Sequence, residues 1–279
     1  MTPCVHDDAR SRSPTGTIAG MRLATFNILH GRALSDGRVD LDRFARAVRE
    51  LDADVLALQE VDLDQPRSHG ADLTRVAAEA MGAPEHRFAA TLHGQPGTWT
   101  AATGDRQPVA AAYGIALLSR YPVRSWQVLA LPGLRHRVPV VHAGTRWPAL
   151  VRDEPRAALA ALVDTPEGPL TAVSTHLTYI AGWNAVQLRR LARSVASHPR
   201  PLVLMGDLNL PGRGPGVVSG LRSLGRVHTF PVEVPDRQLD HILVDGPVTA
   251  LSEAVALDLG MSDHRALRVD VRLGDARGR

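Results

Sequence analysis

The chain has 279 residues, of which 44% are hydrophobic and 22% charged, a composition that is ordinary for a globular protein and a length that allows one large two-sheet domain. No apolar run approaches the ~18–20 residues needed to cross a bilayer, and an aromatic content of 4% argues against a large base-stacking surface for single-stranded nucleic acid. The net charge of +3 permits an acidic partner without requiring one, and the basic residues are all arginine, which suits bidentate phosphate contacts.

The two ends of the chain differ from its middle. Residues 1–19 contain prolines and acidic residues but no apolar stretch of the signal-peptide type, so we expect a disordered tail there. The arginine-rich end, 274–279, is expected to fray. Residues 20–273 contain no Pro/Gly/Ser-rich linker and are predicted to form a single domain. The only cysteine, Cys4, lies in the tail, which excludes a disulfide within the chain and favours a cytoplasmic location.

The first half of the chain mixes strand and helix signals. Apolar runs and alternation predict strands over residues 21–28, 55–58, 89–92 and 113–119. Apolar residues at helical spacing predict amphipathic helices over 40–52 and 72–81. Residues 125–131 are expected to form a strand beside 113–119, and the polar segment 93–109 is expected to be a surface loop.

The second half is richer in strands. Residues 156–163 and 170–175 predict a hairpin, and 184–196 predicts a helix. Further strands are expected over 202–205, 239–244, 248–257 and 266–273. The basic segment 135–147 and the glycine-rich segment 212–216 are expected to be loops, the latter without the pattern of a Walker loop. Strands outnumber helices about two to one, which favours two packed sheets flanked by helices.

Several predicted strands end in, or lead into, a restricted set of polar residues. They are Asn27, Glu60, His176, Asp207 with Asn209, Asp240, and Asp263 with His264. Each alone has a purely structural explanation, such as a turn or a helix cap. Because parallel strands bring their carboxyl ends to one edge of a sheet, these groups could converge there.

Carboxylates, carboxamides and histidines without cysteine suit a hard cation such as Mg²⁺, Mn²⁺ or Ca²⁺. Zinc is less favoured because no His-Glu-x-x-His helix is present, and a serine hydrolase is disfavoured because no Gly-x-Ser-x-Gly elbow is present. Phosphate ester hydrolysis needs on the order of 20 kcal/mol of barrier reduction. General acid–base catalysis supplies about 3–5 kcal/mol of this. A cation and fixed donors would have to supply the rest, so the residue set fits phosphoester cleavage.

The ordered motifs resemble those of the endonuclease/exonuclease/phosphatase superfamily from about residue 21 to residue 273. They are Thr-Phe-Asn27-Ile-Leu-His-Gly, Leu-Gln-Glu60-Val-Asp, Leu-Leu-Ser-Arg-Tyr-Pro, Ser-Thr-His176-Leu, Gly-Asp207-Leu-Asn209, Leu-Asp240-His-Ile-Leu and Ser-Asp263-His264. The resemblance implies an α/β fold, a four-layer α-β-β-α sandwich of two mixed sheets flanked by helices. It also implies phosphoester hydrolysis that depends on Mg²⁺ or Mn²⁺.

The resemblance also implies roles for individual residues. Glu60 is similar to the principal metal carboxylate, with Asn27 beside it and Asp263 near the metal. Asp207 is similar to the residue that orients the attacking water or protonates the leaving oxygen, and Asn209 to its positioning partner.

Both histidines of the motif set have counterparts in the family. His264 resembles the general base or phosphate ligand that Asp240 orients, and His176 resembles the second histidine, which donates to the phosphate or serves as acid. Arg156 and His30 are candidate substrate-binding residues. A surface strand arginine is the alternative for Arg156.

The sequence leaves the substrate open. Leu29 stands where the family's AP endonucleases have an acidic residue, which weakens a repair function and a second metal site. The segments 93–109 and 135–152 correspond to the loops in which phosphatases, nucleases and lipid phosphodiesterases differ. We therefore expect a monomeric phosphodiesterase, without a stable protein partner, that acts on a nucleic acid, a lipid or a small molecule. The alternative is a non-catalytic protein that keeps the fold and binds a polyanion.

Overall fold

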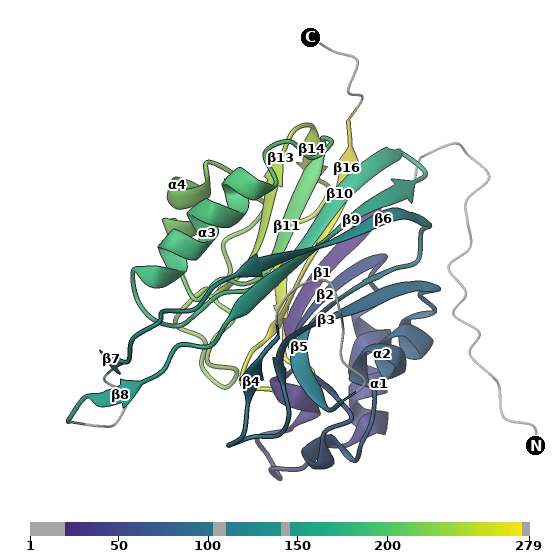
Figure 1. Cartoon of the computed structure of the whole chain (residues 1–279). Helices are drawn as coiled ribbons and strands as arrows, with labels where there is room; N and C mark the ends of the chain where they lie inside the picture. Colours follow the sequence, from purple (N-terminus) through teal and green to yellow (C-terminus); the bar gives the residue numbers. More distant parts are fainter. Residues whose placement is uncertain (1–19, 103–109, 141–145, 275–279) are drawn as a thin grey trace, which may run out of the picture.

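The computed structural model describes residues 20–102, 110–140 and 146–274. The predicted tail 1–19 lies outside these ranges, and so do residues 275–279 of the predicted frayed end 274–279. Gly274 is described, and its amide donates to the Pro247 carbonyl oxygen at 2.8 Å. Two β-sheets pack face to face, and helices cover the outer face of each (Figure 1). This is the α-β-β-α order that the motif resemblance implied.

The first sheet has eight strands in the order β14-β16-β1-β2-β5-β3-β4, with β15 also paired to β16. Their bounds are β1 Met21–Asn27, β2 Val55–Leu63, β3 Glu85–His93, β4 Thr100–Ala101, β5 Ala112–Ser119, β14 Val248–Ala250, β15 Val255–Leu257 and β16 Ala266–Leu273. Strands β1 and β2 run parallel, and the other pairs are antiparallel. The sheet is therefore mixed, as predicted.

The second sheet has six strands in the order β12-β13-β11-β10-β9-β6. Their bounds are β6 Val123–Leu131, β9 Arg156–Thr165, β10 Gly168–His176, β11 Leu202–Asp207, β12 Arg222–Ser223 and β13 Asp240–Asp245. Strands β9 and β10 form the predicted hairpin, and β10 runs parallel to β11. Each sheet thus contains one central parallel pair, whose carboxyl ends supply several of the polar residues singled out in the sequence.

The first two α-helices of the chain begin with aspartate caps. Helix α1 (Leu41–Leu51) begins after Asp40, whose carboxylate accepts a hydrogen bond from the Arg43 amide at 2.9 Å. Helix α2 (Leu73–Met81) begins after Asp72 and ends at Gly82, which has a left-handed φ of 65°. Such an N-cap contributes about 1 kcal/mol.

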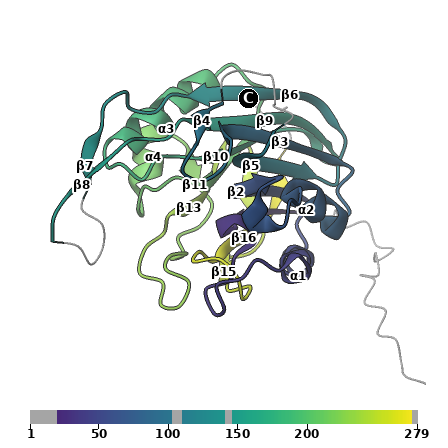
Figure 2. The same cartoon turned by 60° about the horizontal axis from the view of Figure 1, so that its bottom comes forward.

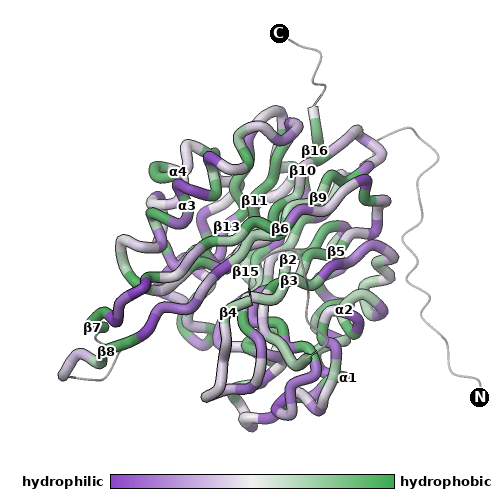
Figure 3. Tube along the Cα trace, viewed as in Figure 1, coloured by the Kyte–Doolittle hydropathy of each residue, from purple (hydrophilic) through white to green (hydrophobic). Residues whose placement is uncertain are grey.

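The helices lie on opposite outer faces. Helices α1 and α2 cover the first sheet, whereas α3 (Trp183–Ser194) and α4 (Gly214–Ser219) cover the second (Figure 2). Two short 3-10 helices, η1 (Leu29–Gly31) and η2 (Pro66–Ser68), follow β1 and β2. Figure 3 shows the apolar residues concentrated along the packed strands, with polar residues more frequent in the connections.

The principal core lies between the sheets. It contains residues such as Leu23, Val55 and Leu117 of the first sheet and Leu159 and Met205 of the second. Because these side chains are closely packed, replacing one by alanine should cost about 2–5 kcal/mol. The packing holds the inner face of each sheet in place. The polar residues at the strand ends are therefore attached to a rigid backbone.

Three strand predictions need correction. Strand β6 pairs with β9 at the edge of the second sheet and not with β5, because β5 is already hydrogen-bonded on both sides, to β2 and β3. Strand β2 continues past Glu60 to Leu63 through a bulge. The predicted strand 248–257 is two short strands, β14 and β15, that pair with different parts of β16.

Three predicted loops contain regular structure. The described part of the segment 93–109 includes the short strand β4, which pairs with the end of β3. The glycine-rich segment includes the short helix α4, which begins with Gly214 and Pro215. The basic segment contains part of a small hairpin of β7 (Val138–Val140) and β8 (Ala149–Val151), which projects from the body of the molecule in Figures 1 and 2. None of the helices that the structure describes is both long and apolar enough to cross a membrane.

Candidate active site

A polar pocket lies where the carboxyl ends of β1, β10 and β11 meet. It is lined by Asn27, Glu60, Tyr113, Glu154, Arg156, His176, Tyr179, Asp207, Asn209 and His264. Strand register explains part of this convergence. His176 and Asp207 are partners at the ends of the parallel strands β10 and β11, and Asp207 is the antiparallel partner of Asp240 at the start of β13. Partners in register share a face of the sheet, so these three residues form a row.

Asn27 connects the two sheets. Its side-chain nitrogen donates to Glu60 Oε1 at 3.2 Å and to Asp207 Oδ2 at 3.1 Å. Asn27 and Asp207 are both buried, so neither amide nor carboxylate depends on solvent for its partners. One carboxamide thus holds two carboxyl groups near each other, in a position where mutual repulsion would otherwise separate them.

Unusual backbone conformations accompany the pocket. Glu60 has φ 58° and lies at the bulge of β2, while Asn209 has φ 50° and Ser262 has φ 66°. Residues other than glycine seldom adopt this left-handed region, and such outliers tend to occur at functional sites. At Glu60 the bulge interrupts the regular alternation of the strand and lets the carboxyl group face the pocket.

His264 lies between two carboxylates. Its Nδ1 is 2.8 Å from Asp240 Oδ2, and its Nε2 is 3.7 Å from Asp207 Oδ2. Burial would lower the pKa of His264, but the charges of Asp240 and Asp207 outweigh it and raise the pKa to about 10. The hydrogen bond to Asp240 also fixes the imidazole, so that Nε2 faces Asp207.

Ser262 ties the His264 loop to β1. Its hydroxyl donates to the backbone oxygen of Asn27 at 2.6 Å and accepts from the His264 amide at 3.1 Å. Ser262 is buried and belongs to the Ser-Asp-His motif, but its role as a connector between Asn27 and His264 was not predicted from the sequence. It is not placed as a nucleophile.

His176 occupies the other side of Asp207. Its Nε2 is 3.4 Å from Asp207 Oδ2, and its Nδ1 is 3.4 Å from Arg156 Nη1. Burial lowers the pKa of His176 well below its ordinary value, and the positive charges of Arg156 and His264 lower it further. Since Arg156 can only donate, the ring nitrogen facing it acts as an acceptor, and a neutral His176 fits this contact. The side-chain nitrogen of Asn209 is 3.4 Å from His176 Nε2.

The acidic residues are harder to ionise than free carboxyl groups. Burial raises the pKa of Asp207 to about 7, against the opposing effects of the His264 charge and of hydrogen bonds from Asn209 and Asn27. Burial also raises the pKa of Glu60, and the charge of Asp263 adds to that shift. A bound cation would favour the ionised form of such groups.

Two sets of residues could hold a cation. Asp207, Asp240 and His264 offer ligand atoms that lie within 4.8 Å of one another. However, an ion bound to all three would compete with the 2.8 Å hydrogen bond between Asp240 and His264. Glu60 and nearby Asp263 provide carboxylate oxygens without breaking that pair, and they suit a hard cation. Asn27 lies beside Glu60, but its nitrogen faces that carboxyl group and its oxygen accepts from the Leu29 amide at 3.2 Å, so its oxygen would have to leave that amide to bind the ion. We therefore favour the second set.

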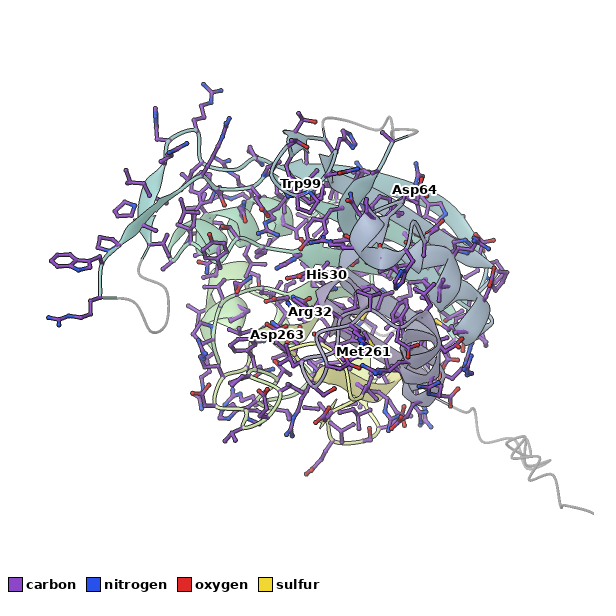
Figure 4. All side chains as sticks on the ribbon, turned by 90° about the horizontal axis from the view of Figure 1, so that it is seen from below. His30, Arg32, Asp64, Trp99, Met261 and Asp263 are labelled. Carbon is purple, nitrogen blue, oxygen red and sulfur yellow. The ribbon has the colours of Figure 1, made fainter. Side chains whose placement is uncertain are left out.

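The pocket includes most of the residues singled out in the sequence. Asn27, Glu60, Arg156, His176, Asp207, Asn209 and His264 line it, and Asp240 lies behind His264. Asp263 is close enough for its charge to act on Glu60, and Figure 4 shows it on the face seen from below.

His30 is not among the lining residues, although Figure 4 shows it on the same face. Burial, together with the charges of Arg67 and Arg32, lowers the pKa of His30 to about 4. Tyr113, Glu154 and Tyr179 line the pocket without having been predicted. The only sequence signal for Glu154 is its place in Glu-Pro-Arg156.

The comparisons with known proteins agree with this architecture. No curated protein matches the sequence. A solved endonuclease/exonuclease/phosphatase from Beutenbergia cavernae is similar with a TM-score of 0.66 at 23% identity, over 92% of this chain and 72% of that one. A mannosyl-6-phosphatase from Bacteroides thetaiotaomicron has a TM-score of 0.56 at 15% identity, over 91% of this chain and 100% of that one.

A D. rerio TDP2 in complex with a single-strand DNA product is similar at a TM-score of 0.56 and 15% identity, over 90% of this chain and 98% of that one. At these identities the likeness concerns the fold. The family model for the endonuclease/exonuclease/phosphatase family matches residues 24–264, which is most of the chain. The protein belongs to the endonuclease/exonuclease/phosphatase family.

Proposed function

We propose that this protein hydrolyses phosphoesters, and phosphodiesters in preference, with Mg²⁺ or Mn²⁺ held by Glu60, Asn27 and Asp263. The observation that carries the proposal is the meeting of Asn27, Asp207 and His264, from both sheets, in one pocket. Membership of a family that includes phosphoesterases supports the same reaction class. We further propose that it acts as a monomer and that it is located in the cytoplasm; the lone Cys4 supports the proposed location.

The proposed roles follow from the positions of the groups. Asp207 Oδ2 is the central acceptor, within 4 Å of Asn27, His176 and His264, and we assign it to orient the attacking water and take its proton. His264, oriented by Asp240, donates to a phosphoryl oxygen. The bound cation supplies further stabilisation of the charge that develops on the phosphoryl group.

Three residues complete the proposed phosphate site. Arg156 donates to a second phosphoryl oxygen, which its guanidinium geometry suits. His176, kept neutral by burial, and Asn209 position Asp207 and its water. The Asn209 amide donates to Asp207 Oδ1 at 2.9 Å, so Oδ2 is left to face the pocket.

An activity assay tests the proposal. Bis(4-nitrophenyl) phosphate should be hydrolysed with Mg²⁺ or Mn²⁺, and EDTA should abolish the release of nitrophenolate. Glu60→Gln and His264→Ala should each lower kcat/KM by at least about 10²-fold, since each removes a charged group from the proposed transition-state site. Glu253→Gln, an exposed substitution away from the pocket, is the matched control. Full activity in both pocket variants would contradict the proposed assignment.

The natural substrate is a separate question. The structural neighbours include a mannosyl-6-phosphatase and a TDP2 bound to a DNA product, so sugar phosphates and nucleic acids are both candidates here. Plasmid and single-stranded DNA, phospholipids and sugar phosphates should be compared under identical metal conditions. The compound with the highest kcat/KM identifies the class of natural substrate.

The alternative, a polyanion-binding protein without turnover, draws support from the projecting hairpin. The segment 135–152 contains no acidic residue, and Arg135, Arg137, Arg146 and Arg152 are exposed. Trp147 is 81% exposed and Leu150 67% exposed. Tight binding of single-stranded DNA or heparin in an anisotropy assay, with no turnover of any ester in Mg²⁺ or Mn²⁺, would favour this alternative.

A further inference from the structure

Arg156 is already engaged before any substrate arrives. Its side chain is about 5% exposed, with Nη2 3.4 Å from Glu154 Oε2 and Nη1 3.4 Å from His176 Nδ1. Its Nε is buried and has no hydrogen-bond partner among the described residues. Glu154 itself is 42% exposed at the side chain and lines the pocket. A negative charge therefore stands beside the guanidinium that faces the pocket.

We infer that Glu154 makes this pocket discriminate against phosphomonoesters in favour of phosphodiesters, through its contact with Arg156. The inference rests on the proposed function, because it assigns the substrate class of the same site. Glu154 is not one of the proposed metal ligands, and its role is one of specificity.

The physical basis is the charge of the phosphate group. Near neutral pH a monoester carries about −1.5 to −2 charges, because its second pKa is about 6. A diester carries one. A phosphate held by Arg156 must lie near Glu154 as well, so every additional negative charge on the phosphate is opposed by that carboxylate. At a separation of a few ångströms in a partly buried site, one extra charge is worth about tenfold in binding or more.

Tyr179 provides a second, independent distinction. It lines the same pocket, is 43% exposed, and lies close enough to Glu154 for that charge to raise its pKa in addition to the effect of burial. Its ring offers an uncharged aromatic surface on the side of the pocket where Glu154 stands. A diester has a second ester group that can pack on this ring, and a monoester does not.

Kinetics with matched esters test the inference. The specificity constants for 4-nitrophenyl phosphate and bis(4-nitrophenyl) phosphate should be compared in Mg²⁺ for the wild type, Glu154→Gln and Tyr179→Ala. Glu154→Gln should raise kcat/KM for both esters, and it should raise that for the monoester about tenfold more than that for the diester, because the monoester carries the additional charge. Tyr179→Ala should lower kcat/KM for the diester and leave kcat/KM for the monoester nearly unchanged. Glu253→Gln should leave the ratio of the two specificity constants unchanged.

Binding measurements separate the inference from the proposed function. In Mg²⁺ buffer at pH 8, Glu154→Gln should tighten the binding of inorganic phosphate about tenfold more than it tightens the binding of dimethyl phosphate, which carries one negative charge fewer. If the wild type hydrolyses neither ester, the proposed function fails, and the phosphate binding still tests Glu154. If the wild type hydrolyses the diester but Glu154→Gln changes neither the ester ratio nor phosphate binding, the inference is wrong while the proposed function stands. Glu154→Ala, which also removes the charge, should reproduce the result.

Discussion

The side-chain amide of Asn27 donates to the carboxylate of Asp207 at 3.1 Å and so joins the end of β1 in the first sheet to the end of β11 in the second. The same nitrogen donates to Glu60 at 3.2 Å. A carboxamide suits this position because it supplies two hydrogens and no charge of its own. The pocket thus depends on a polar contact between two sheets whose packed faces are mainly apolar.

Replacing Asn27 should therefore affect stability as well as activity. Asn27→Ala leaves two acidic groups without their shared donor, and we expect a loss of about 1–3 kcal/mol in the free energy of unfolding. Asn27→Asp should lose more, because it adds a third carboxyl group to the cluster. Urea denaturation in EDTA measures both effects. Wild-type stability in Asn27→Asp would show that the carboxylates do not repel one another as argued.

Ser262 offers a test of positioning. Ser262→Ala removes the donor to the Asn27 carbonyl oxygen and the acceptor of the His264 amide, so we expect destabilisation by about 1–3 kcal/mol. Under native conditions kcat should fall while the Kd for Mg²⁺ changes little. The only proposed metal ligand whose side-chain oxygen the Ser262 hydroxyl contacts is Asp263, among the described residues, and that contact is long, at 3.4 Å. Ser223→Ala, which removes a 2.8 Å bond to Gly225 far from the pocket, is the control. Equal kcat values in the two variants would argue against a positioning role.

Local sequence signals were sufficient for much of the fold. Helices α1 and α2 were predictable because their apolar spacing agrees with aspartate caps at Asp40 and Asp72. The β9–β10 hairpin and β11 were predictable because their apolar runs are bounded by turn residues. Strand β6 was assigned to the wrong sheet because neighbours in sequence are usually neighbours in space, whereas here the chain crosses to the second sheet after β5.

The pocket was predictable to the extent that its residues sit at strand ends. The left-handed conformation of Glu60 within a continuing strand has no sequence signature, since it depends on the pairing of β2 with β5. Glu154 and Tyr179 lie in connections, directly before β9 and directly after β10, so their proximity to Arg156 and His176 is local in sequence, but neither belongs to a motif that singles it out. His30 was included on motif grounds alone, and the structure gives it no place in the lining.

The His264–Asp240 pair should make stability depend on pH. In the folded protein the pKa of His264 is about 10, above its usual value of 6.5. The proton on His264 therefore stabilises the fold fully below pH 6.5, and that stabilisation is lost as the pH rises towards 10. In EDTA the free energy of unfolding should decline from pH 7 to pH 10, and less steeply in Asp240→Asn. NMR of the imidazole ring measures the pKa of His264 directly. A pKa below 7 for His264 in the metal-free wild type would contradict the predicted upward shift.

Metal binding should be visible without any substrate. A cation that binds only the folded state stabilises it by about 2.7 kcal/mol at a concentration of 100 times its Kd. We expect Mg²⁺ to raise the Tm of the wild type and EDTA to reverse the change. Glu60→Gln should lose most of this shift, while Glu253→Gln should keep it. A full shift in Glu60→Gln combined with its loss in Asp240→Asn would favour the cation set of Asp207, Asp240 and His264 instead.

Arg67 and Asp62 support the wall of the pocket from outside. Asp62 is fully buried and accepts hydrogen bonds from Arg67 at 2.7 and 2.8 Å, while the guanidinium lies 5.4 Å from the ring centre of Tyr113. Burial raises the pKa of Asp62 more than the ion pair lowers it, so desolvation dominates this site. Arg67→Met leaves a buried carboxyl group without its partner and should cost about 3 kcal/mol or more.

The same reasoning predicts rescue when the carboxyl group is removed as well. Asp62→Leu combined with Arg67→Met replaces the pair by apolar groups, and buried pairs replaced in this way are often no more costly than the original. We expect the double variant to be more stable than Arg67→Met alone, with a small residual loss from the contact between Arg67 and Tyr113. A double-mutant cycle in urea measures the coupling. If Arg67→Met alone were as stable as the wild type, the Asp62 carboxyl group would have to be satisfied without Arg67, and this explanation of the Tyr113 wall would be wrong.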